Sequence, residues 1–119
     1  MIVGHGIDLQ DIAAVEQVYR KKPRFAQRVL TPSEFEQFKQ KPEVGKMTYL
    51  AGRWAAKEAF SKAMGTGIGK QVGFQDLSIA ATDKGAPYFA KMPFDGKAWL
   101  SITHSAGLVQ ASVILEEEK

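Results

Sequence analysis

The 119-residue sequence contains no cysteine. Disulfides, thiol nucleophiles and zinc sites with cysteine ligands are therefore excluded, and a reducing compartment is the expected location. No apolar run reaches the roughly 20 residues that a membrane-spanning helix needs, so we expect no membrane partner. The first residues have neither a basic segment nor a long apolar core, and they predict no signal peptide. These absences favour a soluble, cytoplasmic protein.

The sequence does contain enough apolar material for one core, with 45% hydrophobic residues in a chain of 13.1 kDa. A chain of this length buries about two-thirds of its unfolded surface, so we expect residues 1–119 to form a single domain. Sixteen Lys and Arg residues against 13 Asp and Glu residues give a net charge of +3. This excess favours an acidic partner or a phosphorylated ligand without distinguishing between them.

The most informative stretch is an alanine-rich helix, predicted from about Met47 to Gly65. At about 100° per residue its apolar side chains form one sector, and Glu58 lies in the middle of that sector. A buried, unpaired charge is costly, so Glu58 should carry a proton, pair with a cation or bind a metal. Lys62, one turn further on, could instead form an ordinary salt bridge with it. Arg53 and Lys57 are interpreted as a second, basic edge of this helix.

The N-terminal residues 1–9 alternate as a β-strand should, and one face of this strand is nearly smooth. Gly4 and Gly6 on that face predict that another element packs very close, and the alanine-rich helix is the expected neighbour. Asp8 at the strand end could then approach Glu58. Two facing carboxylates need a shared proton or a cation, and two oxygen ligands suit magnesium better than zinc. Asp8 could equally be a turn residue, and His5 is interpreted as a packed core residue.

The remaining segments predict a small α+β domain. Asp11 is typical of the N-cap of a helix over 12–19, and the segment 31–34 predicts a helix that ends before Pro42. Gly65 fits the position that follows a helix C-terminus. Strands are predicted over 77–81, 88–90, 99–105 and 108–115, and a turn at 106–107 joins the last two.

Cations gather after the first predicted helix, around a single aromatic side chain, Phe25. The cluster consists of Arg20, Lys21, Lys22, Arg24 and Arg28, with no acidic residue between them. Such a cluster is either a solvated charged face or a docking surface for an acidic partner. Nucleic acid is one such partner, but the segment matches no DNA-reading or RNA-reading module.

Three motifs, taken together, resemble those of the bacterial holo-acyl-carrier-protein synthases. They are Gly6-Ile7-Asp8-Leu9, the block from Arg53 to Ala63, and Ile102-Thr103-His104-Ser105. Their order and separations fit that family over essentially the whole chain. The Trp-x-x-Lys-Glu-Ala-x-x-Lys pattern inside the central block is highly specific, and the other two motifs gain weight from their placement.

The resemblance implies a small antiparallel sheet packed on a long central helix, and a phosphopantetheinyl transferase activity. Coenzyme A would give its 4′-phosphopantetheine arm to a serine of apo acyl carrier protein for fatty acid biosynthesis, releasing adenosine 3′,5′-bisphosphate. The resemblance implies that Asp8 and Glu58 hold Mg²⁺ and act with Lys62 in catalysis, while the general base stays open. The implied coenzyme A contacts are Arg53, Lys62, Gly65 and His104.

The resemblance also implies a homotrimer with active sites at subunit interfaces. The carrier protein would dock on the first helix and on the residues Arg20, Lys21, Lys22, Arg24, Phe25 and Arg28. Gln10 stands where two-domain relatives carry a second acidic metal ligand, which favours the short trimeric class with two protein ligands. The alternatives from other classes are a small basic nucleic-acid-binding module and a non-catalytic assembly protein.

Overall fold

The computed structural model describes residues 1–118 and mixes helices with antiparallel strands, which confirms the α+β prediction. The elements follow in the order β1 (Ile2–Asp11), α1 (Ile12–Lys21), α2 (Arg24–Val29), α3 (Pro32–Gln40), α4 (Glu43–Ala63), the 3-10 helix η1 (Phe74–Asp76), β2 (Ser78–Ala81), β3 (Pro87–Lys91), β4 (Lys97–Ser105) and β5 (Leu108–Glu116). Within this described part, none of the helices combines the length with the apolar character that crossing a bilayer requires.

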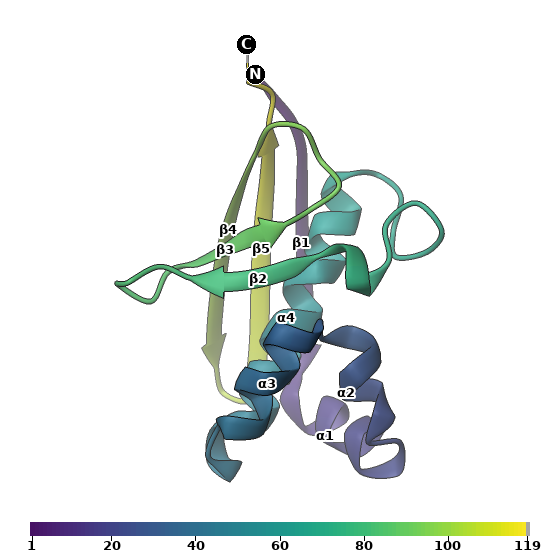
Figure 1. The fold of residues 1–119 in the computed structure, drawn as a ribbon, viewed down its shortest axis with the longest axis vertical. Helices are drawn as coiled ribbons and strands as arrows, with labels where there is room; N and C mark the ends of the chain where they lie inside the picture. The colour runs from purple at the N-terminus through teal and green to yellow at the C-terminus, as the bar shows by residue number, and fades with distance from the viewer. Residues whose placement is uncertain (119) are drawn as a thin grey trace.

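A three-stranded antiparallel sheet in the order β1-β5-β4 packs one face against the long helix α4 (Figure 1). The hairpin of β2 and β3 forms a second sheet and crosses the first in the view of Figure 1. It packs through Phe89, whose ring centroid lies 5.0 Å from that of Phe60 on α4. Helices α1, α2 and α3 gather at the N-terminal end of α4, away from the two chain ends. The implied architecture, a small sheet on a central helix, is therefore confirmed.

The smooth face of β1 is where α4 approaches most closely, as the sequence predicts. A Cβ atom added at Gly4 would overlap the carbonyl oxygen of Ala63, and one added at Gly6 would overlap the carbonyl oxygen of Ala59. Any larger side chain at these two positions would push the helix away from the strand. The two glycines therefore set the spacing and the register between β1 and α4.

Helix α4 begins at Glu43, directly after Pro42, and not near Met47 as predicted. Its first turn carries no apolar stripe, so hydrophobic periodicity alone could not reveal it. The other end agrees with the prediction. Gly65 has a φ of +79°, and its amide donates to the carbonyl of Lys62 over 2.9 Å. Glycine adopts this left-handed conformation without the steric cost that a Cβ atom brings.

The other predicted helix starts are confirmed by hydrogen bonds. A carboxylate oxygen of Asp11 accepts from the amides of Ala13 at 2.9 Å and Ala14 at 3.3 Å. The Glu34 carboxylate accepts from the amide of Thr31 at 2.8 Å, as the capping-box pattern requires. Helix α2 was not predicted, because six residues inside a charged segment give too little periodicity.

The face of the three-stranded sheet that points away from α4 is exposed and mixes polar with large apolar side chains. Its large exposed side chains include Val3, Ile7, Leu9, Trp99 and Leu108. His5 belongs to this same face and is exposed, so its interpretation as a packed core residue is wrong. Alternation assigned the residues of β1 to two faces correctly, but it could not say which face α4 would cover.

Candidate functional site

Asp8 lies inside β1, on the face that meets α4, with its side chain 11% exposed. The ammonium of Lys62 donates to Asp8 Oδ1 at 2.9 Å and to the carbonyl of Ile7 at 3.1 Å. The side-chain amide of Gln10 donates to the other oxygen, Asp8 Oδ2, at 2.6 Å. Since β1 continues to Asp11, the alternative that Asp8 is a turn residue at the strand end is wrong.

Glu58 is half-buried on α4 and accepts a hydrogen bond from the indole N–H of Trp54 at 3.4 Å. The sequence also allowed an ordinary salt bridge between Glu58 and Lys62, but Lys62 pairs with Asp8 instead. Gly4 lies against Ala63, and Gly6 lies against Ala59. A step of two residues forward along β1 therefore corresponds to a step of four residues back along α4. Continuing that series places Asp8 against the turn of α4 that precedes Ala59, and Glu58 belongs to this turn.

The chemistry of this donor set suits a hard cation. Among residues 1–118 there is no group of three or more His, Cys, Asp or Glu side chains that could hold a metal ion. Asp8 and Glu58 offer carboxylate oxygens, and Mg²⁺ commonly takes one or two carboxylates and fills its other positions with phosphate and water. The ammonium of Lys62 at Asp8 also shows that positive charge is accepted here. The pair therefore fits a cation that is shared with a phosphorylated ligand.

A second group of predicted residues lines a cleft of about 500 Å³ between α4, β4 and the β2–β3 turn. Arg53 stacks its guanidinium on the ring of Tyr49, with 4.4 Å between the guanidinium carbon and the ring centroid. The Nε atom of Arg53 is the one buried side-chain nitrogen or oxygen of residues 1–118 without a hydrogen-bond partner. Lys41 and the exposed His104 line the same cleft, so it suits an anionic ligand.

The charge of Arg53 also affects the pKa of Tyr49, whose phenol ring lines the same cleft. Burial raises the pKa of Tyr49, and the positive charge of Arg53 opposes that shift. Tyr49 donates its hydroxyl hydrogen to the carbonyl of Glu34 at 3.2 Å. The phenol therefore stays neutral and holds the ring that supports the guanidinium.

The predicted coenzyme A contacts form two groups within one chain. Arg53 and Lys62 are nine residues apart on α4, which places them on opposite sides of the helix at 100° per residue. Arg53 and His104 line the cleft, whereas Lys62 and Gly65 are absent from its lining. Lys62 lies instead beside Asp8. A single ligand can reach both groups only by passing around α4 or by lying between two subunits.

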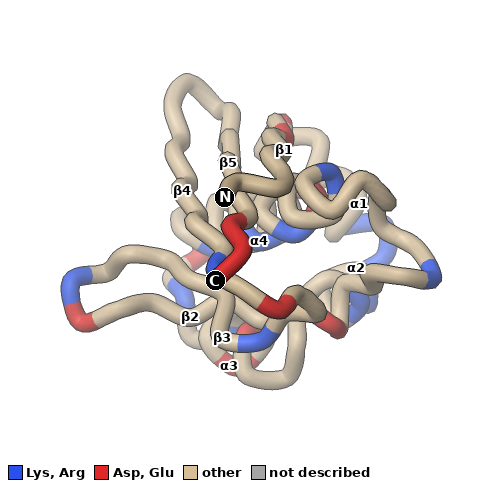
Figure 2. The backbone as a smooth tube through the Cα atoms, turned by 90° about the horizontal axis from the view of Figure 1, so that it is seen from above, with Lys and Arg blue, Asp and Glu red and all other residues tan. Residues whose placement is uncertain are grey.

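The predicted docking residues lie around α1 and α2, where Figure 2 shows basic backbone segments gathered on one side. Lys22, Pro23, Arg24, Phe25 and Arg28 line a hollow of about 410 Å³. Lys21 is exposed beside it. Arg20 differs from the others, since it pairs with Glu16 at 2.7 Å on the exposed face of α1.

Two aromatic rings connect this hollow with Glu58 of the candidate cation site. The ring of Phe25 meets the ring of Trp54 edge-on, with centroids 4.8 Å apart. The indole of Trp54 in turn donates to Glu58. The docking side chains and the candidate cation site are thus neighbours in space.

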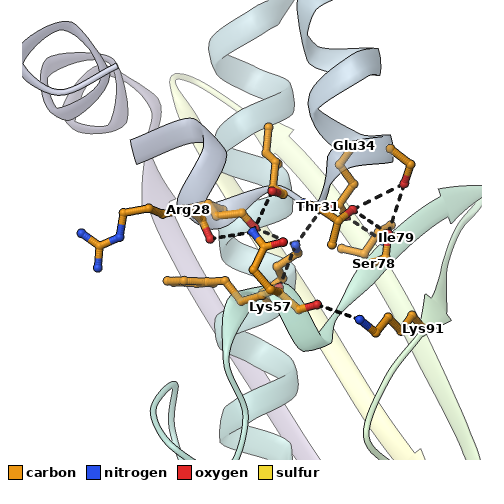
Figure 3. Close-up of polar contacts among 12 residues, drawn as sticks. Arg28, Thr31, Glu34, Lys57, Ser78, Ile79 and Lys91 are labelled. Carbon is orange, nitrogen blue, oxygen red and sulfur yellow. Dashed lines mark hydrogen bonds and ion pairs between the residues drawn. The ribbon is translucent and has the colours of Figure 1, made fainter. Parts of the chain in front are cut away.

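Lys57 is fully buried, so its interpretation as part of a second basic edge of the helix, together with Arg53, is wrong. Its ammonium donates to Glu34 Oε1 at 2.6 Å, to the carbonyl of Val29 at 2.6 Å and to the carbonyl of Phe74 at 3.1 Å (Figure 3). Glu34 Oε2 accepts from the amide of Ile79 at 2.7 Å. Burial lowers the pKa of Lys57, and the negative charge of Glu34 opposes that shift.

Lys57, together with Gln75, also holds the C-terminal end of α2. The side-chain amide of Gln75 donates to the carbonyls of Gln27, Arg28 and Leu30 at 2.8 to 3.1 Å, and Lys57 serves the carbonyl of Val29. The last carbonyls of a helix lack intrahelical partners, so these bonds hold α2 by its backbone. The guanidinium of Arg28 meanwhile points away from the cluster (Figure 3).

Sequence reasoning missed the Glu34–Lys57 pair although a signal for it exists. Glu34 lies one helical turn before the buried Phe38 and next to Phe35, on the apolar face of its helix. Lys57 likewise lies three residues before the buried Phe60. One acidic and one basic residue on two apolar faces should have suggested a buried pair, since each alone would be too costly to bury.

Comparisons with known proteins agree with the motifs. A family model described as the 4′-phosphopantetheinyl transferase superfamily matches residues 4–114. The holo-[acyl-carrier-protein] synthase of Streptococcus equi subsp. zooepidemicus is 64% identical over 117 residues, 98% of each chain. A crystal structure of the holo-(acyl-carrier-protein) synthase from Bacillus anthracis in complex with CoA (3′,5′-ADP) is 40% identical, has a TM-score of 0.92 and covers 99% of both chains.

A crystal structure of the Helicobacter pylori holo-[acyl-carrier-protein] synthase in complex with coenzyme A is also similar. It is 35% identical with a TM-score of 0.82, and the match covers 94% of this chain and 99% of that one. The similarity therefore extends over sequence and fold along nearly the whole described chain.

Proposed function

The chain belongs to the 4′-phosphopantetheinyl transferase superfamily, and from this premise we propose that it acts as a holo-acyl-carrier-protein synthase. It transfers the 4′-phosphopantetheine arm of coenzyme A to a serine of apo acyl carrier protein. The observation that carries the proposal is the crossing of β1 and α4, where Asp8 and Lys62 from two separate motifs are in contact and Glu58 lies one helical turn before Lys62. The similarity to synthases supports this reading over a nucleic-acid-binding module.

The reaction exchanges the phosphoanhydride bond of the coenzyme A pyrophosphate for a phosphoester bond to the carrier serine. The serine hydroxyl oxygen of the carrier attacks the phosphorus that bears the pantetheine arm, the bond from that phosphorus to the bridging pyrophosphate oxygen breaks, and adenosine 3′,5′-bisphosphate leaves. The serine proton passes to a base that stays open. Negative charge accumulates on the phosphate oxygens and on the leaving group, so positioning and electrostatic stabilisation supply most of the catalysis.

Asp8 and Glu58 would hold Mg²⁺ through their carboxylates, and a bound magnesium ion would stabilise charge on the pyrophosphate. Lys62 is suited to the same phosphates, because its side chain is 51% exposed and can leave Asp8 for a ligand. Arg53 and His104 would bind the anionic nucleotide end of coenzyme A in the cleft. The backbone at Gly65 is free of a side chain and would allow a close approach.

A homotrimer with active sites between subunits is part of the proposal. Two observations support it: several large apolar side chains on the outer face of the β1-β5-β4 sheet are exposed in one chain, and the two groups of coenzyme A contacts lie on opposite sides of α4. A neighbouring subunit could supply the cleft of Arg53 and His104 to the carboxylates of Asp8 and Glu58. We also propose a cytoplasmic location, which fits a chain without cysteine.

The carrier protein would dock on the surface formed by Lys21, Lys22, Arg24, Phe25 and Arg28, with Arg20 at its edge. An acidic partner would be attracted to this cationic surface before contact. Phe25 supplies the apolar centre that a specific interface needs. The serine of the docked carrier would then face the nearby site of Glu58.

The test is incubation of an apo acyl carrier protein with coenzyme A, Mg²⁺ and the protein, followed by intact-mass spectrometry. We expect the carrier to gain the mass of one phosphopantetheine arm, and a carrier whose acceptor serine is replaced by alanine to gain nothing. Mg²⁺ removal by a chelator should stop the gain. An unchanged carrier mass, alongside an active synthase as positive control, would refute the proposed function.

A further inference from the structure

Each of the two proposed metal-binding carboxylates receives a hydrogen bond from an uncharged N–H group. The amide of Gln10 donates to Asp8 Oδ2 at 2.6 Å, and the indole of Trp54 donates to Glu58 Oε2 at 3.4 Å. Neither donor belongs to the catalytic or binding residues described above. Gln10 lies two residues after Asp8 on the same face of β1, and Trp54 lies one helical turn before Glu58.

Both donors are held in place by the fold. Gln10 is half-buried and sits in the strand register opposite Val109 of β5. Trp54 is half-buried, and the ring of Phe25 packs against its ring at 68°. Half-buried donors on such elements have a restricted choice of positions, so they favour one orientation of the carboxylate that accepts from them.

The absence of charge on these donors matters for a cation site. An ammonium or guanidinium that stayed beside the carboxylates would repel a divalent cation, whereas an amide or indole N–H orients an oxygen without adding positive charge. The two carboxylate oxygens of Asp8 accept from one donor of each kind, neutral and charged. Its Oδ2 faces the amide of Gln10, and its Oδ1 faces the ammonium of the half-exposed Lys62, which can move away.

We propose that Gln10 and Trp54 are positioning residues of the cation site: each holds one oxygen of a ligand carboxylate with a neutral N–H and leaves the other oxygen for the cation. This inference rests on the proposed role of Asp8 and Glu58. It assigns Oδ1 of Asp8 and Oε1 of Glu58 as the coordinating atoms. It also makes Trp54 the contact through which Phe25 of the docking surface supports the orientation of Glu58.

The experiment measures Mn²⁺ binding by electron paramagnetic resonance, with coenzyme A at saturation and carrier protein omitted, so that no transfer occurs. Gln10→Ala should raise the Mn²⁺ dissociation constant about tenfold, the lower range for removing a partner that orients a metal ligand. Trp54→Phe keeps the ring against Phe25 and removes only the longer N–H bond, so we expect a rise of about threefold. Gln40→Ala, on the exposed end of α3, is the control and should bind like the wild type.

Coenzyme A affinity without metal, measured by calorimetry, separates positioning from general loosening of the fold. It should be unchanged in Gln10→Ala and Trp54→Phe, and a fall equal to the loss in Mn²⁺ affinity would overturn the inference. Wild-type Mn²⁺ affinity in either variant would refute the role of that residue, provided that Asp8→Asn and Glu58→Gln lose binding. If Asp8→Asn and Glu58→Gln also bind Mn²⁺ normally, the proposed metal site itself is wrong.

Discussion

At the scale of single residues, Lys57 shows how a motif residue can be necessary without touching the ligand. Its ammonium carries three hydrogen bonds, and these reach three separate parts of the chain: α2, α3 and η1. Removing it would leave Glu34, which is 1% exposed, as a buried charge without its cation. The motif therefore contains one lysine, Lys57, that is buried in the fold and one, Lys62, that is half-exposed and is proposed to act in the reaction.

Lys57→Met should lower the free energy of unfolding by about 3–5 kcal/mol, the cost of breaking a buried ion pair on one side. The double variant Lys57→Met/Glu34→Gln should recover part of that loss, because it removes the uncompensated charge. Urea unfolding of the wild type, both single variants and the double variant gives the coupling energy directly. Additive effects of the two substitutions would show that the pair does not act as a unit.

The same residue shows what sequence reasoning can and cannot supply. The motif identified Lys57 as significant, but its partner Glu34 lies 23 residues earlier, and only the packing of α3 against α4 brings them together. The contact of Lys62 with Asp8 spans 54 residues and was missed for the same reason. Local periodicity pointed to Lys62 pairing with Glu58 within one helix, whereas the nearer carboxylate belongs to β1.

At the scale of elements, the crossing of β1 and α4 determines the site. The glycines of β1 and the alanines of α4 predicted this close packing, and the overlap that a Cβ atom at Gly6 would have with Ala59 confirms it. Capping residues and Gly65 also predicted several element ends correctly. The first turn of α4 escaped prediction because it carries no apolar stripe, and α2 escaped it because its apolar residues, Phe25, Ala26 and Val29, span little more than one turn.

Gly6→Ala should destabilise the protein by at least about 1–3 kcal/mol, since α4 must shift to accept the added methyl group. It should also reduce transferase activity, because the shift separates Asp8 from Glu58. Gly45→Ala is the matched control, as its added Cβ meets no atom within 4 Å, and it should be stabilising by up to about 1 kcal/mol in a helix. Thermal unfolding and the carrier mass assay check both expectations. Equal stability of Gly6→Ala and Gly45→Ala would contradict close packing of β1 on α4.

At the scale of the whole molecule, the basic side chains form two separate surfaces, which would suit the two proposed acidic partners. The docking surface of α1 and α2 lies on one side of α4, and the cleft of Arg53 lies toward β4 and the β2–β3 turn. A carrier protein and coenzyme A can therefore approach without competing for the same cations. The net charge of +3 indicated acidic ligands, but only the fold shows that the cations form separate surfaces.

Arg28→Glu should lower kcat/KM for the carrier protein by about tenfold or more at low salt, because electrostatic attraction raises association rates by that order. The value of kcat should change little, and the salt dependence of kcat/KM should weaken. Lys39→Glu, an equal charge reversal on the exposed surface of α3, is the control. A change confined to the affinity for coenzyme A would place Arg28 in the nucleotide site and remove it from the docking surface.

The proposed homotrimer would bring together the two groups of coenzyme A contacts, Arg53 with His104 and Lys62 with Gly65. Arg53 and Lys62 point to opposite sides of α4, so a neighbouring subunit would have to bring a nucleotide cleft to each pair of carboxylates. The exposed apolar side chains on the outer face of the β1-β5-β4 sheet would supply a surface for that contact. Sequence could imply this arrangement only through resemblance, because a single chain carries no signal for which of its faces meet in a trimer.

A crystal structure of the protein with coenzyme A and Mn²⁺ tests the central claim most directly, because the anomalous signal of manganese locates the cation without ambiguity. We expect one manganese site per chain, bound by Asp8 and Glu58 and by the coenzyme A pyrophosphate, with Arg53 and His104 of an adjacent subunit on the nucleotide. Manganese bound elsewhere, or coenzyme A held without either carboxylate, would contradict that claim.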